Sequence, residues 1–368
     1  MAEGRVEEES VPARIVVIGT GLIGTSIALA LRGRGGEVLL ADRDETALAM
    51  AVELGAGDAL PAGGPGEPAD LAVLCVPPAA VAVTLLDAQK RRLAAVYTDV
   101  ASVKALPLRQ AADLGCDLTS FVAGHPLAGR ERSGPAAARP DLFLGRPWAL
   151  CPTAETRPEA VATVTALVQA CGAQAVTVDA GHHDRSVALV SHAPHVESPA
   201  VAARLTGADD TALGLAGQGV RDVTRIAASD PKLWIGILNA NADPVADVLE
   251  AVATDLAVAA SLLRDGSEGA AAHVADLLLR GNAGRSRIPG KHGSQDKTYA
   301  TVPVVIPDRP GELAMIFQAA GIAGVNIEDV TIEHSPGRPL GVLEIVVKPE
   351  AAEKLAAELR SRGWSVPG

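Results

Sequence analysis

The chain has 368 residues, a formal net charge of −12 and a pI near 5.2; this length allows two or three domains, and the acidic balance argues against a general nucleic-acid-binding protein. Hydrophobic residues make up 48% of the chain but aromatic residues only 2%, which predicts aliphatic cores rich in helix-forming alanine. The four cysteines are far apart without C-x-x-C spacing, so we expect reduced thiols rather than disulfides or a zinc ribbon.

Residues 1–12 are predicted to form a flexible, acidic tail. Their opening segment, MAEGRVEEES, lacks the basic and apolar regions of a signal peptide. No apolar run is long enough to cross a bilayer. We therefore expect a cytoplasmic protein with no membrane partner.

Residues 13–180 alternate between strand and helix patterns. The segment RIVVIGTGLIGTSIALALRGRG predicts a strand, a tight turn and a helix, and EVLLADRD predicts a second strand. Further buried strands are predicted in ADLAVLCVPP, AAVYTDVAS, TSFVAGHP, RPWALCP and QAVTVDA. This alternation indicates an α/β fold with a parallel sheet, here a Rossmann-type dinucleotide-binding domain.

The turn after the first strand places Gly19, Gly21 and Gly24 in G-x-G-x-x-G spacing. In this motif the glycines permit the tight turn, the approach of the pyrophosphate and the close packing of the helix. Asp42 ends the next strand, where a carboxylate accepts hydrogen bonds from ribose hydroxyls and repels a 2′-phosphate. The predicted cofactor is therefore NAD, and the adjacent Arg43, a group able to accept that phosphate, leaves NADP as the alternative.

Other residues are predicted at the same edge, because ligands of open parallel sheets bind at the carboxyl ends of the strands. Leu22 and Ile23 open the first helix and Val76 ends a strand, and all three are predicted to bind the cofactor. His125 and Ser102 also follow strands. The alternatives are a loop histidine and an N-cap serine, but the shared edge favours catalysis. Neutral histidine would then accept a hydroxyl proton, and the serine would orient the imidazole and the substrate hydroxyl.

Residues 181–280 have a helical pattern and predict a separate all-helical domain for substrate binding and dimerisation. Ser191, His192 and His195 share a face if the helix continues through Pro194. A zinc site at the histidines is disfavoured because no acidic residue has H-E-x-x-H-type spacing, so we expect no metal. The alanine- and leucine-rich segment 243–263 carries more apolar surface than a small bundle buries, which predicts a homodimer.

The segment GVRDVTRIAASDPKLW carries Arg221 and Arg225 in a helix otherwise spaced for burial. The guanidinium fork is well shaped for a carboxylate, which predicts recognition of an acidic substrate. A surface ion-pair set that includes Asp222 is the alternative, and Trp234 is expected to lie in the core.

Residues 281–298 are rich in Gly, Arg, Ser and Lys without an apolar period and predict a linker. Residues 299–368 follow the order βαββαβ of a ferredoxin-like unit, with the last short strand in WSV. Pro303 lacks a ladder donor, so regular pairing of the first strand is predicted to start after it.

Several motifs together resemble a known family. GTGLIGTSIALAL, TDVASVK, GHPLAGRERSG, DRSVALVSHAPH and TRIAASDPKLW occur in the order found in the prephenate/arogenate dehydrogenases of tyrosine biosynthesis. The resemblance spans about residues 14–263. It implies NAD-dependent oxidative decarboxylation of prephenate to 4-hydroxyphenylpyruvate, or of arogenate to tyrosine.

The resemblance also implies roles for individual residues. His125 matches the histidine that takes the proton of the ring hydroxyl, and Ser102 matches the serine that orients it. Arg225 matches the arginine that holds a substrate carboxylate. His195 matches a histidine of the substrate pocket, and Ser191, four residues earlier, is predicted to share that pocket.

The chain departs from the family pattern at three positions. Ala101 and Ala193 stand where glycine and leucine are common, and Glu197 adds a charge to a usually apolar helix. Glu197 either pairs with Arg204 or lies near substrate, where it would bear on the choice between prephenate and arogenate.

The segment IPDRPGELAMIFQAAGIAGVNIEDV resembles an ACT domain, a small module that often binds amino acids. The turn from Asp308 to Gly311 opens a helix, where free N–H groups receive a carboxylate, and Asn326 begins the next strand. These residues are predicted to bind a regulatory ligand, with tyrosine as the effector. A plain dimerisation module is the alternative.

Two other functions fit less well. A β-hydroxyacid dehydrogenase relies on a catalytic lysine in its helical domain, but Lys232 is the only lysine between Lys104 and Lys291 and sits in a D-P-K turn. A redox-sensing regulator needs a basic helix that reads DNA, and the sequence offers none.

Overall fold

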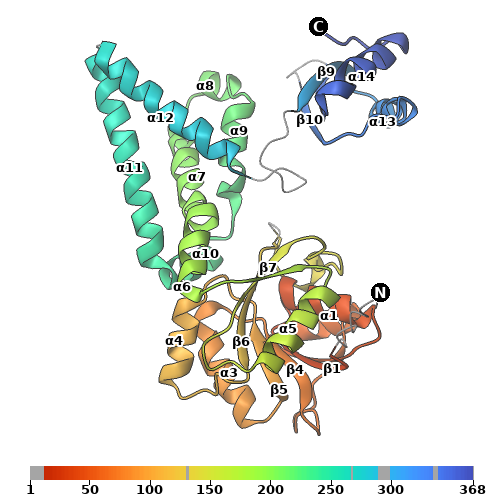
Figure 1. The fold of residues 1–368 in the computed structure, drawn as a ribbon, viewed down its shortest axis with the longest axis vertical. Coiled ribbons are helices and arrows are strands. Elements are labelled where there is room, and N and C mark those ends of the chain that lie inside the picture. Colours follow the sequence, from red (N-terminus) through yellow and green to blue (C-terminus); the bar gives the residue numbers. More distant parts are fainter. Residues whose placement is uncertain (1–11, 130–131, 267, 289–298, 335–338, 368) are drawn as a thin grey trace, which may run out of the picture. The chain divides into compact units, whose positions relative to one another are not determined.

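The computed structural model describes residues 12–129, 132–266, 268–288, 299–334 and 339–367 (Figure 1). It divides into two compact units, residues 1–253 and 254–368, with the boundary inside helix α11 (Ala242–Asp265). The helices α6–α10 therefore belong to the same unit as the large sheet.

The first unit contains an eight-stranded sheet in the order β3-β2-β1-β4-β5-β6-β7-β8. Its strands are β1 (Arg14–Ile18), β2 (Glu37–Ala41), β3 (Asp58–Ala59), β4 (Ala69–Leu74), β5 (Ala94–Asp99), β6 (Phe121–Pro126), β7 (Pro147–Cys151) and β8 (Gln174–Thr177). Neighbours from β3 to β6 are parallel, which confirms the predicted Rossmann-type α/β fold. However, β7 is antiparallel to β6, because the described connection holds a short 3₁₀ turn instead of a crossover helix.

Helices cover both faces of this sheet (Figure 1). They are α1 (Leu22–Arg32), α2 (Glu45–Glu53), α3 (Val81–Lys90), α4 (Ala105–Asp113) and α5 (Pro158–Ala170). Alternate residues of β1 enter opposite cores: Ile15 and Val17 pack with residues of α1 and α5, and Val16 packs with residues of α3 and α4. Because helices cover both faces of the sheet, the predicted site lies at its edge, at the carboxyl ends of the strands.

The helical part of the first unit continues through Pro194. Its helices are α6 (Ala180–Val187), α7 (Pro194–Ala202), α8 (Asp210–Gly214), α9 (Gln218–Thr224) and α10 (Pro231–Ala240). A π-helical turn, Ala188–His192, joins α6 to α7, and Ala193 donates its N–H to the carbonyl of Ala188 at 2.9 Å. Proline has no N–H and crowds the carbonyl four residues earlier, and the wider turn lets the helix pass this point.

Helix α12 (Glu268–Ser286) corrects the predicted start of the linker. The helix runs past residue 281, and its Arg280 forms ion pairs with Asp255 of α11 and with Asp276, both at 3.0 Å. These contacts hold Arg280 against α11 and within α12. The Gly- and Arg-rich composition from which the linker was predicted does not reveal that the helix continues. Residues 289–298 of the predicted linker lie outside the described residues.

The C-terminal part contains a three-stranded antiparallel sheet in the order β10-β11-β9. Its elements are β9 (Ala300–Pro307), α13 (Glu312–Ile322), β10 (Asp329–His334), β11 (Leu340–Val347) and α14 (Pro349–Ser361). Side chains of β9 and β11 form one core with Ile316 of α13 and Leu355 of α14. The predicted last strand is reduced to a single bridge between Val305 and Ser365.

Pro303 does not delay the pairing of β9, contrary to the prediction. The ladder with β11 already begins at Ala300, opposite Val347. Val305 donates its N–H outward, to the carbonyl of Ser365 at 2.9 Å. Residues two apart in a strand direct their backbone groups to the same side, so Pro303 lacks a donor only on the outer edge, where proline is tolerated.

Within the described residues, no helix is long and apolar enough to span a membrane.

Candidate active site

The glycine-rich turn between β1 and α1 has little tolerance for side chains. Gly19 has φ +105°, and a Cβ there would lie 2.2 Å from the carbonyl oxygen of Cys75. A Cβ on Gly24 would lie 1.9 Å from the carbonyl oxygen of Gly19. Around Gly21, by contrast, no described atom lies within 4 Å of a built Cβ. This is the combination a dinucleotide needs: a closed turn, a closely packed helix and open space where the pyrophosphate approaches.

Asp42 follows β2 and contacts the same turn. Its carboxylate accepts hydrogen bonds from the backbone N–H and the hydroxyl of Thr20, and from the N–H of Asp44 at 2.9 Å. Burial raises the pKa of Asp42, but these hydrogen bonds outweigh it and leave the pKa below its usual value. Asp42 is therefore a carboxylate at neutral pH, and Oδ1, with one described hydrogen bond, retains acceptor capacity for a ribose hydroxyl.

The remaining predicted cofactor residues lie beside this turn. Leu22 and Ile23 begin α1, with Ile23 packed against the core that α1 and α5 share. Val76 follows β4 and packs against the core on the other face. All three are partly exposed, which leaves surface for a ligand.

His125 lies at the end of β6, held by a buried ion pair. Lys104 and Asp99 are fully buried and bonded to each other. Asp99 accepts the N–H of Gly124 at 3.0 Å, and Lys104 donates to the carbonyl of Gly124 at 2.6 Å. Both backbone groups of the residue before His125 are thereby fixed, and the same pair anchors the loop that carries Ser102, because Asp99 also accepts the N–H of Ala101.

The imidazole of His125 is suited to accept a proton. Burial lowers its pKa well below the usual value, and the nearness of Lys104 and of the two histidines His183 and His192 disfavours a positive charge on the ring further. The ring is therefore neutral at pH 7, and part of the residue remains exposed to meet a substrate.

Ser102 is close in sequence to these residues, but the described hydrogen bonds do not join it to the imidazole. The described hydrogen bond of His125 goes from Nδ1 to Nε2 of His183 at 2.9 Å. Ser102 is also not the N-cap of α4, a position that Lys104 occupies. Its predicted catalytic role stays a prediction.

A second group of site residues comes from the helical part of the same unit. His195 stacks on Trp234 with ring centroids 3.6 Å apart, and His192 meets the edge of the same indole. His195 donates Nδ1–H to the carbonyl of Ser191 at 2.8 Å, which leaves Nε2 as an acceptor. Trp234 is thus half-buried beside the histidines rather than in the core as expected.

Arg225 lies close enough to His195 for its charge to contribute to lowering the pKa of that histidine, after burial. Arg225 is exposed at the start of a 3₁₀ turn, Arg225–Ala228. The described ion pairs include none among Arg221, Asp222 and Arg225, and Asp222 instead accepts from Gln218. The alternative of a surface ion-pair set therefore has no support.

Glu197 projects from a different side of helix α7 than His195. It is two residues after His195, about 200° around helix α7. The described ion pairs do not join it to Arg204, and it keeps part of its surface exposed.

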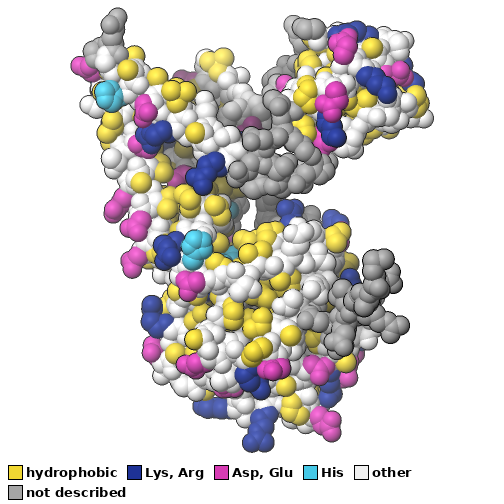
Figure 2. All heavy atoms as spheres, viewed as in Figure 1, with side chains coloured by type: hydrophobic (Ala, Val, Ile, Leu, Met, Phe, Trp, Pro, Cys, Tyr) yellow, Lys and Arg dark blue, Asp and Glu magenta, His cyan; other side chains and the backbone are white. Residues whose placement is uncertain are grey.

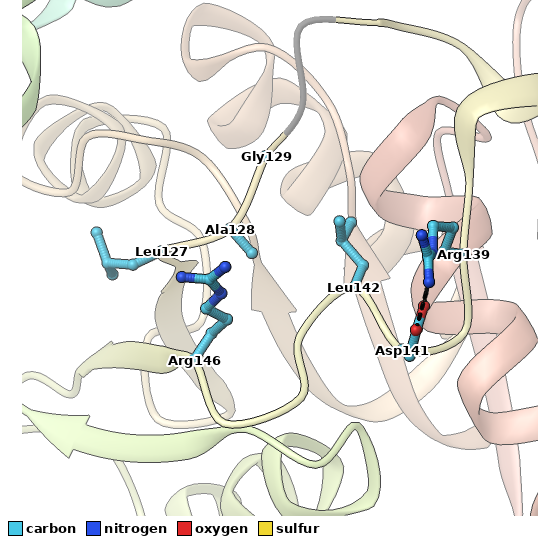
Figure 3. Close-up of a pocket in the computed structure, with 7 residues that line it drawn as sticks. All are labelled: Leu127, Ala128, Gly129, Arg139, Asp141, Leu142 and Arg146. Atoms are coloured by element: carbon cyan, nitrogen blue, oxygen red, sulfur yellow. Dashed lines mark hydrogen bonds and ion pairs between the residues drawn. The ribbon is translucent and has the colours of Figure 1, made fainter. Parts of the chain in front are cut away.

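A polar cavity of about 430 Å³ adjoins the segment that follows His125 (Figure 3). Leu127, Ala128 and Gly129 line one side. On the other, Arg139 forms a two-bond ion pair with Asp141, and Arg146 points toward the Leu127–Ala128 side (Figure 3). The basic residues following His125 begin at Arg130, which lies outside the described residues.

Among the described residues, no group of three or more His, Cys, Asp or Glu side chains is arranged to hold a metal ion.

In the C-terminal sheet unit, backbone hydrogen bonds already use some of the N–H groups of the predicted ligand turn. Gly311 has φ +87° and precedes α13, but the N–H groups of Asp308 and Glu312 already bond to the carbonyls of Pro339 and Arg309. Asn326 donates to Glu328 at 2.9 Å. Fewer N–H groups are therefore free to bind a ligand carboxylate than the sequence of the turn predicted.

Two family models and a curated relative match the chain. Residues 27–177 match the nucleotide-binding domain of prephenate dehydrogenase, and residues 179–274 match its dimerization domain. The probable prephenate dehydrogenase NovF of Streptomyces niveus is 43% identical over 357 residues, which are 95% of this chain and 98% of the relative. The chain belongs to the prephenate dehydrogenase family.

Solved structures of the prephenate dehydrogenase family extend the comparison. Synechocystis arogenate dehydrogenase shares 29% identity and a TM-score of 0.63, over 74% of this chain and 99% of that one. Prephenate dehydrogenase from Aquifex aeolicus, in complex with hydroxyphenyl propionate and NAD⁺, shares 26% identity and a TM-score of 0.63, over 73% of this chain and 96% of that one.

Sequence reasoning about this family member missed the residues that act through His125. Lys104 and Asp99 were present in TDVASVK, and His183 and Asp184 in the HHD triplet, but periodicity does not reveal which charged groups become buried partners. The signal available was chemical: a lysine or a histidine needs polar partners if it is buried.

Proposed function

We propose that the chain catalyses the oxidative decarboxylation of prephenate to 4-hydroxyphenylpyruvate with NAD, in the biosynthesis of tyrosine. The observation that carries the proposal is the neutral, backbone-clamped imidazole of His125 at the same sheet edge as the glycine-rich turn. The strands between β1 and β6 set their separation, about 15 Å for three strand spacings, a span that an extended dinucleotide bridges.

In this reaction the chain's own residues accept one proton and bind a substrate that carries two carboxylates. The unprotonated nitrogen of His125 takes the hydroxyl proton of the substrate ring. A bound NAD would supply the acceptor for the hydride that leaves the ring carbon bearing this hydroxyl. Loss of CO₂ then lets the ring become aromatic, so the protein only has to orient the substrate. Arg225 and His195 are proposed to hold it through a carboxylate and a polar contact, with Ser191 beside them.

Two choices within this reaction each have an alternative. Prephenate is favoured by the 43% identical relative, whereas arogenate is the alternative because a solved relative of similar fold is an arogenate dehydrogenase. NAD is favoured over NADP by the ionised Asp42 and by the NAD⁺ in a solved relative, although Arg43 is exposed beside it.

A homodimer is part of the proposal. The residues that match the dimerization-domain model include α11 and the first part of α12, up to residue 274. Both helices expose large apolar side chains (Figure 2), namely Leu256, Val258, Leu263, Leu278 and Leu279. Apolar surface of this extent on helices is typical of a subunit interface.

The test is an absorbance assay of prephenate and arogenate, each with NAD and NADP, on wild type and on His125→Asn. We expect prephenate with NAD to give the highest kcat/KM, and the variant to retain cofactor binding while kcat falls about 10²–10⁴-fold, as loss of a general base does. Because the pKa of His125 is lowered, wild-type kcat should stay level as pH falls through about 6.5, the usual pKa of histidine. It should drop only at a pH well below that value. A variant within a few-fold of wild type would refute the base.

A further inference from the structure

The second nitrogen of His125 begins a buried chain of three side chains. Nδ1 of His125 lies 2.9 Å from Nε2 of His183, and Nδ1 of His183 lies 2.8 Å from Oδ1 of Asp184. The two imidazoles meet edge to face, with centroids 5.1 Å apart. His183 and Asp184 are each 3% exposed, so water does not compete for these hydrogen bonds.

The other partners of Asp184 give this chain a direction. Its Oδ1 and Oδ2 accept the backbone N–H groups of Lys104 and Ala105, both at 2.8 Å. Donated N–H groups favour the charged carboxylate, which only accepts hydrogen bonds. Nδ1 of His183 must therefore carry the proton of that contact, and in a neutral ring Nε2 is then an acceptor. It follows that Nδ1 of His125 is the donor and Nε2 of His125 is the free base.

We propose that His183 and Asp184 are positioning residues that fix His125 in the Nδ1–H tautomer and stabilise the imidazolium formed during the reaction. This inference rests on the proposed function. When the substrate O–H bond breaks, its proton forms an N–H bond at Nε2 of His125, and the electron pair left on oxygen forms the carbonyl as hydride departs to NAD. The positive charge spreads over the ring, and the Nδ1–H bond to His183 becomes charge-assisted.

The neighbouring titratable groups are already engaged in other hydrogen bonds. Lys104 is bonded to Asp99 and to the carbonyl of Gly124, and Nδ1 of His192 is bonded to Asn241 at 3.0 Å. Among the described residues, His183 is thus the partner that orients the ring. Serine proteases show how much such a contact contributes, since removal of the orienting carboxylate there costs about 10⁴-fold in kcat.

The kinetic test compares three variants of the full-length protein. His183→Leu removes the acceptor, whereas the amide oxygen of His183→Gln reaches the position of Nε2. We expect His183→Leu to lose about 10²-fold or more in kcat with both KM values within a few-fold of wild type, and His183→Gln to recover much of it. His182→Gln, at the exposed neighbouring histidine, should match wild type. Equal kcat values for His183→Leu and wild type would overturn the proposal, and so would a loss that His183→Gln fails to rescue.

A second measurement does not depend on turnover. Nitrogen chemical shifts of ¹⁵N-histidine-labelled protein, with the His125 signals assigned by their loss in His125→Asn, report which ring nitrogen carries the proton. We expect a protonated Nδ1 in wild type and a shift toward protonated Nε2 in His183→Leu. Protonated Nε2 in wild type overturns the inference whatever the substrate, whereas inactivity toward prephenate and arogenate with the expected tautomer overturns only the proposed reaction.

Discussion

His125 acquires its chemistry from residues that are distant in the sequence. Its pKa is lowered by burial and by charges from three other segments, and its ring contacts His183, 58 residues away. The histidine itself was identifiable from the segment GHP, because it follows a predicted strand. The partners were not, because burial depends on the packing of α6 against the start of α4.

Arg225 provides a prediction at this scale. Replacing it with glutamine should raise KM for prephenate about tenfold or more and leave kcat nearly unchanged, because a charge-assisted contact to a carboxylate exists in both ground and transition states. Steady-state kinetics measures both values. Arg221→Gln, four residues earlier and also exposed, is the matched control and should stay within twofold. A collapse of kcat at constant KM would show that Arg225 acts in the chemical step instead.

The connection between β5 and β6 shows how elements are held in register around the site. Asp99 ends β5, Lys104 precedes α4, and together they bond to the residue before His125 in β6. A buried charge pair of this kind contributes little net stability, but the loss of one partner is costly because the other remains buried and unpaired.

Lys104→Met should accordingly lower the free energy of unfolding by about 3–5 kcal/mol, measured by urea denaturation. The exposed Lys90→Met in α3 is the control, with an expected change below about 0.5 kcal/mol. The double variant Asp99→Asn/Lys104→Met removes the orphaned charge and should recover part of the loss. If Lys104→Met alone costs less than about 1 kcal/mol, the pair does not act as a clamp.

Element boundaries were predictable where local chemistry decides them. The glycine-rich turn, the strand before Asp42 and the order of the C-terminal elements all follow from periodicity and turn residues. The reversed β7 was not predictable, since its direction depends on a connection without a helix. The helix through Pro194 and the continuation of α12 past residue 281 likewise depend on a π turn and on ion pairs that only the fold brings together.

At the scale of the whole molecule, the C-terminal sheet unit has a folded core of its own, and its predicted role is regulation by tyrosine. Gly311 opens α13 with a positive φ, yet the neighbouring N–H groups of Asp308 and Glu312 already bond to the carbonyls of Pro339 and Arg309. Any ligand there must therefore displace or supplement these contacts, which favours weak binding over a rigid site.

The prediction is that millimolar tyrosine inhibits the full chain but not a chain ending at Ile288, just after α12. Coupling requires tyrosine to bind the less active state more tightly, typically by about 1–3 kcal/mol, which corresponds to about 5- to 150-fold in affinity.

The shortened protein must first keep the uninhibited kcat and, by light scattering, the mass of a dimer. Both proteins should give twice the mass expected for one chain, which for the full chain is 37.4 kDa. Equal inhibition of the two proteins would locate tyrosine in the active site as a competitor, and a monomeric mass at micromolar concentration would refute the proposed homodimer. Inhibition confined to the full chain, and weakened by Asn326→Ala, would place the effector at the turn before α13 and the strand that Asn326 precedes.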